Sequence, residues 1–299
     1  MTKRFLAVGE CMIEMAPTEA GTYAMGFAGD TLNTVWYMRQ LLSDGWKTGY
    51  FSAVGQDTVS EQMLSFLNEA GIETSSVRRV ADKTVGLYMI SLDDGERSFS
   101  YWRSDSAAKQ LATEPTLLAD AFFSADMIYF SGITLGILSA ADRKRFLAEV
   151  AKARSNGVQV AFDSNLRPRL WASVSEMCEA VTDAALVSDI VLPSFEDEAQ
   201  FFGDATLQAT AKRYADCGVG TVIVKNGSGS LLSFVNGVEE SHNSVGAVDV
   251  IDTTAAGDSF NAGFLANWLE DKGVRDCVQA GAALAARVVA HRGALIGLD

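Results

Sequence analysis

The stretch Asp252-Thr-Thr-Ala-Ala-Gly-Asp258 runs directly into Ser259-Phe-Asn-Ala-Gly-Phe-Leu-Ala-Asn-Trp268. The second part predicts a helix, because aromatic residues recur every four positions at Phe260, Phe264 and Trp268. Residues 255–258 then form the first turn of this helix or the loop that leads into it. The first N–H groups of a helix lack internal partners and lie at the positive end of its dipole. Small residues at that point therefore predict a site where an anion approaches the backbone.

Asp258 adds a carboxylate to this turn, which is unexpected for a site that only binds anions. The combination fits a phosphoryl group held by the backbone while the carboxylate takes a proton from an attacking hydroxyl. In the alternative interpretation Asp258 caps the helix and the small residues before it serve packing.

Composition limits the class of protein. The chain has 299 residues, 48% of them apolar and 21% charged, which predicts a soluble globular protein with one large α/β domain or one domain with a small appendage. A net charge of −14 disfavours nucleic acid and membrane as partners. Four scattered cysteines and two histidines argue against a zinc site or a disulfide framework. Without the pattern of a signal peptide or a membrane span, we expect a cytoplasmic protein.

Apolar segments alternate with helical patterns along most of the chain, which predicts a parallel sheet covered by helices on both faces. The expected strands are residues 5–9, 50–54, 127–130, 158–162, 189–192 and 221–225. The expected helices are residues 31–42, 61–70, 140–155, 175–186, 196–202, 206–217 and 278–290. Residues 23–30, before the first expected helix, are rich in Gly and Ala.

A second strand-rich region flanks the turn signal Asp93-Asp-Gly-Glu96. Phe99, Tyr101 and Arg103 alternate with Ser98, Ser100 and Trp102. One face is therefore polar and aromatic and would suit a small sheet that lies over a site. Closure of such a lid would exclude water from the reaction. Its exposed edges predict pairing between copies, so we expect a homo-oligomer.

Two nucleotide-binding patterns are missing from the sequence. No Gly-x-x-x-x-Gly-Lys-Ser/Thr motif occurs, and no Gly-x-Gly-x-x-Gly follows the first strand, which disfavours a P-loop and a dinucleotide oxidoreductase. Gly227-Ser-Gly229 predicts a hairpin whose backbone could pass over a phosphate, and Lys225 before it would suit a polyphosphate. An ordinary turn explains these glycines as well.

The string Asp252-Thr-x-Ala-Ala-Gly-Asp258, continued by Ala262-Gly-Phe-Leu265, resembles the C-terminal signature of the ribokinase-like (PfkB) carbohydrate kinases. The resemblance extends over essentially the whole chain. It implies an α/β fold with a central, mostly parallel sheet flanked by helices, in a single domain 1–299 with a small β-sheet lid from about residues 11–26 and 84–103. It also implies ATP and Mg²⁺ as cofactors, and leaves open a monovalent cation such as K⁺.

The resemblance assigns roles to individual residues. Asp258 would be the catalytic base, with the anion hole formed at Ala255, Ala256 and Gly257. Phe27-Ala-Gly29-Asp30-Thr-Leu-Asn33 resembles the first family signature, with Ala28 in place of a Gly, and implies that Gly29, Asp30 and Asn33 contact the sugar. The residues implied for ATP are Asn165, Lys225, Gly227, Gly229, Ala256 and Gly257.

Two roles stay open at this point. Asp252 would position the anion-hole loop, the metal shell or a substrate hydroxyl, and it is included among the substrate contacts. Pro193-Ser194-Phe-Glu-Asp197-Glu198 falls where the family carries Asn-x-x-Glu, so the acid that helps to place Mg²⁺ through water is Asp197 or Glu198. A helix cap with an acidic first turn explains these residues as well.

The substrate class follows from a narrower resemblance. Phe99-Ser-Tyr101-Trp-Arg103, Phe130-Ser-Gly-Ile133 and Asn165-Leu-Arg167-Pro-Arg-Leu-Trp171 resemble the 2-keto-3-deoxygluconate kinases. The implied substrate contacts are Tyr88, Tyr101, Arg103, Ile133 and Arg167. Two guanidinium groups in one pocket suit a carboxylate, with which Arg forms two parallel hydrogen bonds, and serve no purpose for a neutral sugar.

We therefore expect transfer of the ATP γ-phosphoryl group to the 6-hydroxyl of 2-keto-3-deoxy-D-gluconate. One alternative is the same chemistry on a neutral sugar such as fructose or ribose. Another is a protein that binds a sugar acid without catalysis, which the presence of both Asp252 and Asp258 disfavours.

Overall fold

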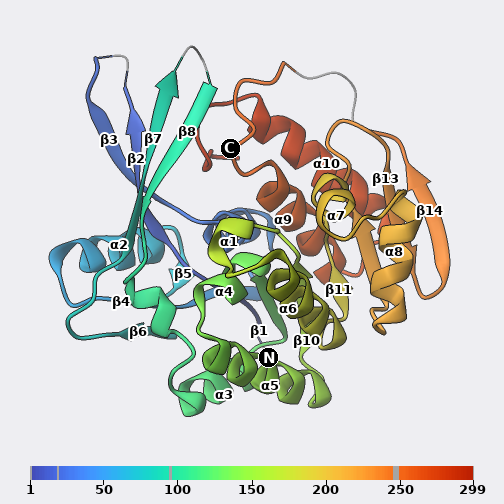
Figure 1. Cartoon of the computed structure of the whole chain (residues 1–299), viewed down its shortest axis with the longest axis horizontal. Helices are drawn as coiled ribbons and strands as arrows, with labels where there is room; N and C mark the ends of the chain where they lie inside the picture. The colour runs from blue at the N-terminus through green and yellow to red at the C-terminus, as the bar shows by residue number, and fades with distance from the viewer. Residues whose placement is uncertain (1, 19, 94–95, 245–248, 299) are drawn as a thin grey trace.

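The computed structural model describes residues 2–18, 20–93, 96–244 and 249–298. Within them the chain forms a larger sheet flanked by helices and a smaller sheet that projects from it (Figure 1). The larger sheet has the strand order β14-β13-β12-β11-β10-β9-β1-β4-β5, and β6 pairs with β4. Its strands are β1 (Lys3–Val8), β4 (Trp46–Val54), β5 (Ile72–Glu73), β6 (Val77–Arg79), β9 (Met127–Ser131), β10 (Gln159–Asp163), β11 (Ile190–Val191), β12 (Thr221–Val224), β13 (Leu231–Val235) and β14 (Val238–His242). Pairing is parallel except at β12–β13 and β13–β14, so the predicted mostly parallel sheet is confirmed.

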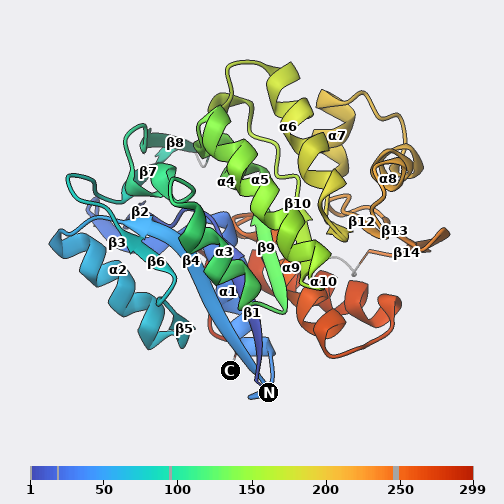
Figure 2. The ribbon, with the colours of Figure 1, turned by 90° about the horizontal axis from the view of Figure 1, so that it is seen from below.

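Helices cover both faces of this sheet because its strands are apolar on both sides. On β1, Leu6 and Val8 face one core while Phe5 and Ala7 face the other. The first core includes α3 (Pro115–Phe123), α4 (Gly132–Ile137), α5 (Ala140–Ser155), α6 (Val174–Leu186) and α8 (Leu207–Asp216), with α7 (Phe195–Phe201) packed against it. The second core includes α1 (Asp30–Leu41), α2 (Thr58–Glu69), α9 (Ala256–Leu269) and α10 (Val274–Val289). Figure 2 shows α6 and α8 on one side of the sheet and α10 on the other.

The smaller sheet, here called the second sheet, has the order β3-β2-β7-β8 and stands away from the larger one (Figure 1). Its strands are β2 (Met12–Pro17), β3 (Tyr23–Ala28), β7 (Gly86–Asp93) and β8 (Glu96–Trp102). The pairs β2–β3 and β7–β8 are antiparallel, whereas β2 and β7 run parallel. Two antiparallel pairs, widely separated in the sequence, therefore join side by side.

The structure corrects some of the predicted elements. Residues 23–28 form β3 of the second sheet, so this strand ends two residues beyond the expected lid boundary at residue 26. Helices α3 and α4 were also not predicted. The centre of the predicted turn at 93–96, residues 94–95, lies outside the described residues. The helix predicted at 140–155 is confirmed as α5, whereas the last helix begins at Val274 rather than at 278.

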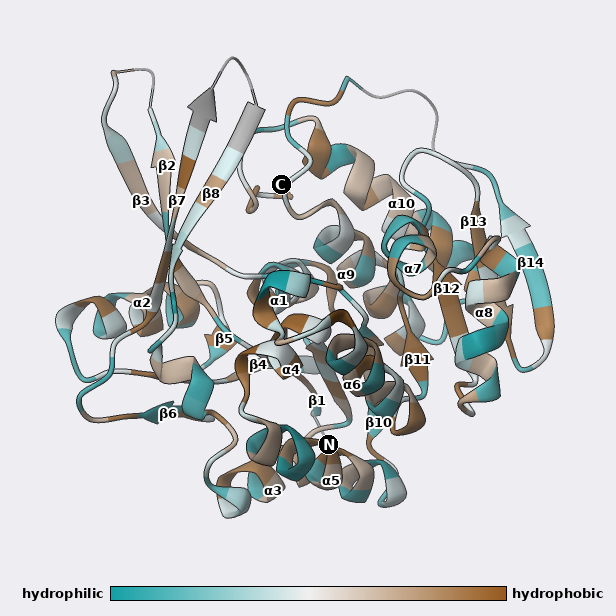
Figure 3. Cartoon of the chain, in the orientation of Figure 1, coloured by the Kyte–Doolittle hydropathy of each residue, from teal (hydrophilic) through white to brown (hydrophobic). Residues whose placement is uncertain are grey.

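Hydropathy follows this layering. Figure 3 shows hydrophobic colour along β11, β12 and β13 and hydrophilic patches on α3, α5 and α8. None of the helices in the described part of the chain combines the length and apolar character that crossing a membrane requires.

Helix α9 is seated by close backbone contact with α10. A Cβ atom added to Gly263 would lie 2.8 Å from both the Ala280 carbonyl oxygen and the Gly281 Cα. Real Cβ atoms do not approach backbone this closely, so glycine lets the two helices meet. Because α9 carries Asp258 at its first turn, this contact helps to fix the position of the carboxylate.

We expect Gly263→Ala to lower the free energy of unfolding by about 1–3 kcal/mol, because α9 and α10 must separate to admit the methyl group. Urea unfolding followed by circular dichroism measures the change. Gly45→Ala is the matched control, since its Cβ would lie 3.6 Å from Ser43 Oγ, an ordinary contact. Equal stability of the two variants would show that the helix contact does not constrain α9.

Candidate active site

A cavity of about 310 Å³ lies where the strands of the larger sheet end, beneath the second sheet. In parallel sheets this carboxyl-terminal edge is where ligands bind. The lining residues come from both sheets and from the starts of α1 and α9: Glu10, Met12, Gly29, Asp30, Asn33, Tyr88, Phe99, Tyr101, Arg103, Ile133, Asp163, Asn165, Arg167, Ser194, Asp197, Lys225, Thr253, Thr254, Ala255, Ala256, Gly257 and Asp258. Most residues that the sequence singled out are therefore gathered in one place.

The start of α9 presents backbone donors to the cavity. Ala255 is the N-cap residue with φ 59° and ψ 16°, a left-handed conformation that is unfavourable for a residue with a side chain. The Ala256 N–H bonds to the Thr253 carbonyl oxygen at 3.2 Å. The next two N–H groups, of Gly257 and Asp258, have no acceptor among the described residues. The turn thus offers two donors at a positive helix end, as an anion site requires.

Asp252 holds this turn in place. Its Oδ1 accepts a hydrogen bond from the Thr254 N–H at 2.9 Å, and its Oδ2 accepts one from the Gly293 N–H at 2.7 Å. The side chain is buried and is absent from the residues that line the cavity. Of the three roles left open by the sequence, this geometry supports positioning of the loop that contains Ala255.

The Asp258 carboxylate is aimed by its neighbours on α1. Its Oδ2 accepts a hydrogen bond from Asn33 Nδ2 at 2.8 Å, and its carbonyl oxygen accepts one from Thr34 Oγ1 at 3.3 Å. Burial, together with the negative charges of Asp30 and Asp163, raises the pKa of Asp258 to about 8. A carboxylate with such a pKa is a far better proton acceptor than an ordinary aspartate.

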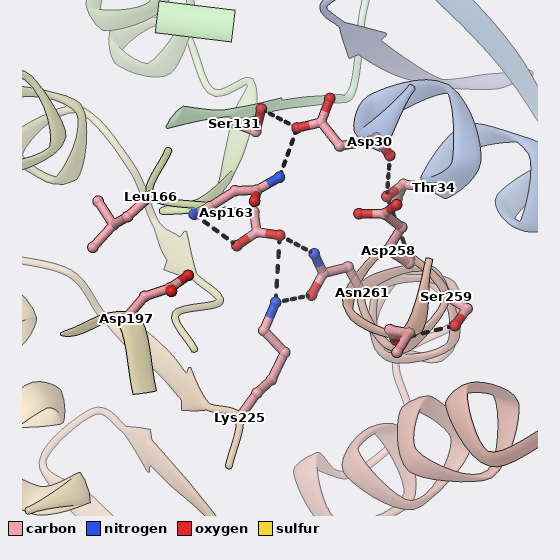
Figure 4. Close-up of polar contacts among 12 residues, drawn as sticks. Asp30, Thr34, Ser131, Asp163, Leu166, Asp197, Lys225, Asp258, Ser259 and Asn261 are labelled. Atoms are coloured by element: carbon pink, nitrogen blue, oxygen red, sulfur yellow. Dashed lines mark hydrogen bonds and ion pairs between the residues drawn. The ribbon is translucent and has the colours of Figure 1, made fainter. Parts of the chain in front are cut away.

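Asp30 and Gly29 occupy the start of α1. Asp30 Oδ2 accepts hydrogen bonds from Ser131 Oγ and from Asn165 Nδ2, the latter at 2.9 Å, and burial raises the pKa of Asp30 (Figure 4). A Cβ atom on Gly29 would lie 2.2 Å from the Glu10 carbonyl oxygen, so only glycine fits there. All three residues expected at the sugar from the first signature line the cavity.

A buried polar network forms part of the cavity floor (Figure 4). Asp163 Oδ2 accepts hydrogen bonds from Asn261 Nδ2 at 2.7 Å and from Lys225 Nζ at 3.3 Å. Lys225 also donates to Asn261 Oδ1 at 3.0 Å, and Asn261 Nδ2 lies 3.0 Å from Tyr129 Oη. Lys225 thus lines the cavity while its ammonium group is held by the floor.

The hairpin predicted around Gly227 and Gly229 is present between β12 and β13. Gly227 has φ 51°, in the region that favours glycine. Neither glycine is among the residues that line the cavity, so the structure places this part of the expected ATP site beside the cavity rather than in it.

Two arginines enter the cavity from different elements. Arg103, which follows β8, pairs through Nη2 with Glu10 Oε2, and Ser106 Oγ donates to the other Glu10 oxygen. Arg167 lies in the loop after β10, where its Nη1 is 3.4 Å from Asp197 Oδ2. The Arg103 side chain is 12% exposed and that of Arg167 is 52% exposed. The first guanidinium is therefore fixed by a buried ion pair, whereas the second is half exposed and is held by a 2.6 Å hydrogen bond from Nη1 to the Leu166 carbonyl oxygen.

Apolar and aromatic groups complete the region around these arginines. Tyr88 donates a hydrogen bond through its hydroxyl to Glu14 Oε2, and its ring packs against those of Phe99 and Tyr101. Ile133, on α4, lines the cavity as the sequence predicted.

The two candidates for the metal-shell acid have different surroundings. Glu198 is fully buried and accepts hydrogen bonds from Arg213 Nη2 at 2.6 Å and from Tyr214 Oη at 3.0 Å. Asp197 lines the cavity beside Ser194. The geometry therefore favours Asp197 and gives Glu198 a role in joining α7 to α8.

Sequence reasoning missed Glu10 and the floor residues Asp163 and Asn261. A carboxylate two residues after the end of the buried strand β1 was an available signal for Glu10. Asp163 likewise ends β10 at the ligand-binding edge. Asn261 lies inside a helix pattern and gave no signal.

The family model described as "pfkB family carbohydrate kinase" matches residues 2–299 of the chain. The chain belongs to the pfkB family of carbohydrate kinases. The 2-dehydro-3-deoxygluconokinase of Dickeya dadantii is 38% identical over 100% of this chain and 98% of that protein. The 2-dehydro-3-deoxygluconokinase of Escherichia coli is also 38% identical, over 99% of this chain and 98% of that protein.

Solved structures agree with this pfkB assignment. A PfkB protein from a Polaromonas species superposes with a TM-score of 0.85 and 25% identity, covering 96% of each chain. A putative ribokinase II from Escherichia coli, solved in complex with ATP and Mg²⁺, gives a TM-score of 0.85 at 21% identity over 98% of this chain and 94% of that one. The ribokinase-like α/β fold implied by the sequence is confirmed. Membership of this kinase family implies the use of ATP and Mg²⁺.

The raised pKa of Asp258 predicts a pH-dependent effect on stability. The folded protein holds this proton more tightly than the unfolded chain, so the stability it contributes is lost as pH rises from about 4, the ordinary value, through about 8. Asp258→Asn removes this loss. We expect the melting temperature of the variant to exceed that of the wild type by more at pH 8.5 than at pH 5.

Differential scanning calorimetry at the two pH values measures this difference. Asp44→Asn is the control, because Asp44 is exposed and its substitution should act alike at both. A difference between Asp258→Asn and the wild type that does not change with pH would contradict the assignment of a raised pKa.

Proposed function

We propose that this protein transfers the γ-phosphoryl group of ATP to the 6-hydroxyl of 2-keto-3-deoxy-D-gluconate, giving ADP and the 6-phosphate. The observation that carries the proposal is the presence of two guanidinium groups, Arg103 and Arg167, in the same cavity as Asp258. The full-length relatives named 2-dehydro-3-deoxygluconokinase support the same acceptor, which is the same compound under its systematic name.

Arg103 and Arg167 bind the acceptor carboxylate. Arg103 is anchored by Glu10, and its Nε is buried with no acceptor among the described residues. The Arg103 guanidinium is therefore held in a fixed orientation with one N–H still able to donate a hydrogen bond. Arg167 exchanges its 3.4 Å contact with Asp197 for the substrate. Tyr88, Tyr101 and Ile133 enclose the carbon chain.

Asp258 is the general base. It accepts the proton of the 6-hydroxyl, whose oxygen forms a bond to the γ-phosphorus as the bond from that phosphorus to the bridging oxygen of ADP breaks. The N–H groups at the start of α9 donate to the oxygens of the migrating group, where negative charge develops. Asn33 keeps the carboxylate aimed, and Gly29, Asp30 and Asn33 bind hydroxyl groups of the sugar.

Mg²⁺ would neutralise phosphate charge when bound. In the described residues no three His, Cys, Asp or Glu side chains converge on a point that could hold a metal. A donor set of one cavity carboxylate, Asp197, with water and phosphate oxygens fits a Mg²⁺ ion, which retains water and is bound through few carboxylates. Asn165, Lys225, Gly227 and Gly229 contribute to binding of the nucleotide.

The second sheet acts as the lid of a single kinase domain, formed from about residues 11–26 and 84–103. Its edge strands expose Met25 (51%) and Trp102 (58%), and these edges would mediate a homo-oligomer. The net charge of −14 fits a small-molecule kinase of the cytoplasm better than a partner of nucleic acid or membrane.

ADP release with Mg·ATP tests the proposal directly. We expect activity with 2-keto-3-deoxygluconate and none with fructose, ribose or gluconate, because these compounds lack the keto-deoxy acid structure.

Asp258→Asn should lower kcat by about 10²–10⁴-fold, since only the base is lost. Calorimetry should still detect binding of both substrates. Normal turnover by this variant would refute the role of Asp258 as the base. Activity of the wild type on neutral sugars alone would refute 2-keto-3-deoxygluconate as the acceptor.

Arg167→Ala should raise KM for the sugar acid by about 10–100-fold, because a hydrogen-bonded charge is lost. The KM for Mg·ATP should stay at the wild-type value and serves as the internal control. An unchanged KM for the acid would mean that Arg167 does not bind the carboxylate.

A further inference from the structure

A second cavity of about 590 Å³, here called the outer cavity, adjoins the active-site cavity. The two share five residues, and these include both arginines proposed to bind the carboxylate: Phe99, Tyr101, Arg103, Ile133 and Arg167. The remaining residues of the outer cavity are Ser104, Lys109, Gly136, Ile137, Pro168, Arg169 and Leu170. It therefore opens beside the acid-binding end of the site, and no step described above uses its other residues.

The two cavities differ in charge. The active-site cavity is lined by five carboxylates and three cations, which are Glu10, Asp30, Asp163, Asp197, Asp258, Arg103, Arg167 and Lys225. The described residues that line the outer cavity include four cations, Arg103, Lys109, Arg167 and Arg169, and no acid. The net charge of −14 repels an anionic acceptor from the protein as a whole. The four cations of the outer cavity attract it locally.

Lys109 and Arg169 line the outer cavity from two different elements. Lys109 lies on the 3₁₀ helix η1 (Ala107–Gln110), shortly after the second sheet, and Arg169 lies on η2 (Pro168–Leu170), after β10. Within the described residues neither side chain forms a hydrogen bond or ion pair, in contrast to Arg103 with Glu10. Their charges are thus not cancelled by a bound partner.

The walls of the outer cavity strengthen this field. Gly136, Ile137, Pro168 and Leu170 are apolar or lack a polar side chain, and low-dielectric walls focus the potential of nearby charges. A cleft of one sign of charge with such walls raises the local concentration of the opposite ion.

We propose that the outer cavity is the access route of the sugar acid, in which Lys109 and Arg169 attract the carboxylate and pass it to Arg103 and Arg167. This rests on the proposed acceptor being an acid. The two residues increase the rate of productive encounter and take no part in the phosphoryl transfer. Their effect should therefore be seen in kcat/KM for the sugar acid, and it should weaken as the salt concentration rises.

The test measures kcat/KM for 2-keto-3-deoxygluconate from low to high ionic strength in the full-length protein. We expect Lys109→Gln and Arg169→Gln each to lower kcat/KM about twofold at low salt, and the double variant to lower it about fourfold. These differences from the wild type should vanish at about 0.3 M salt, where the screening length is shorter than about 8 Å. The kcat and the KM for Mg·ATP should not change. The decline of kcat/KM with salt should be shallower in the double variant than in the wild type.

Lys272→Gln is the matched control, because Lys272 is exposed and lies with Lys3 and Trp46 at the opposite end of the sheet. It removes the same charge and should leave both kcat/KM and its salt dependence unchanged. An equal loss in this control would show that only net charge matters and would overturn the proposal.

Two further outcomes separate this inference from the proposed function. Wild-type activity on the acid, with the double variant matching it at every salt concentration, would refute the access route alone. Absence of ADP release from the wild type with the acid would refute the proposed acceptor, and the access route with it. A fall in kcat rather than in kcat/KM would place Lys109 or Arg169 in the chemical step and would likewise overturn the inference.

Discussion

The ion pair between Glu10 and Arg103 joins the two sheets of the molecule. Glu10 lies where the chain leaves β1 for β2, and Arg103 lies where it leaves β8. The buried Glu10 carboxylate is tolerated because Arg103 and Ser106 donate hydrogen bonds to its two oxygens. Loss of one partner of a buried ion pair typically destabilises the folded state by about 3–5 kcal/mol. The same carboxylate leaves no room for a side chain at Gly86, where a Cβ would lie 2.8 Å from Glu10 Oε1. The angle of the second sheet, and with it the shape of the cavity, depends on this pair.

Burial and the crowding of carboxylates set the proton affinity of the site. Burial raises the pKa of both Asp258 and Asp30, and the negative charge of Asp30 raises the pKa of Asp258 further. The same burial weakens the folded state when a carboxylate is ionised. The chain tolerates this arrangement because its neutral donors, Asn33 and Asn165, are placed to bind the oxygens without cancelling the charge. An acidic pocket that takes an acidic substrate must then confine its cations to the few positions that meet the carboxylate.

The larger sheet and the start of α9 could be predicted because both are encoded by short-range patterns, namely apolar runs and small residues before an aromatic helix face. The bounds of β3 could not, since this partly exposed edge strand shows no apolar alternation. The choice between Asp197 and Glu198 also required the structure, because adjacent residues on a helix point in different directions, and Arg213 lies behind one of them. Glu10 shows the same limit: its partners are distant in the sequence and meet only in the fold.

The pairing of β2 with β7 has a consequence for the order in which the chain folds. The β2–β3 pair ends at Ala28 and β7 begins at Gly86, with α1, β4, α2, β5 and β6 between them. Closing a loop of that length becomes favourable once the intervening segment has collapsed onto β1. During synthesis the N-terminal strands must therefore wait, with the β2 edge unpaired, until β7 has left the ribosome. An unpaired strand edge is open to pairing with another chain, so slow translation between residues 28 and 86 would favour aggregation over folding.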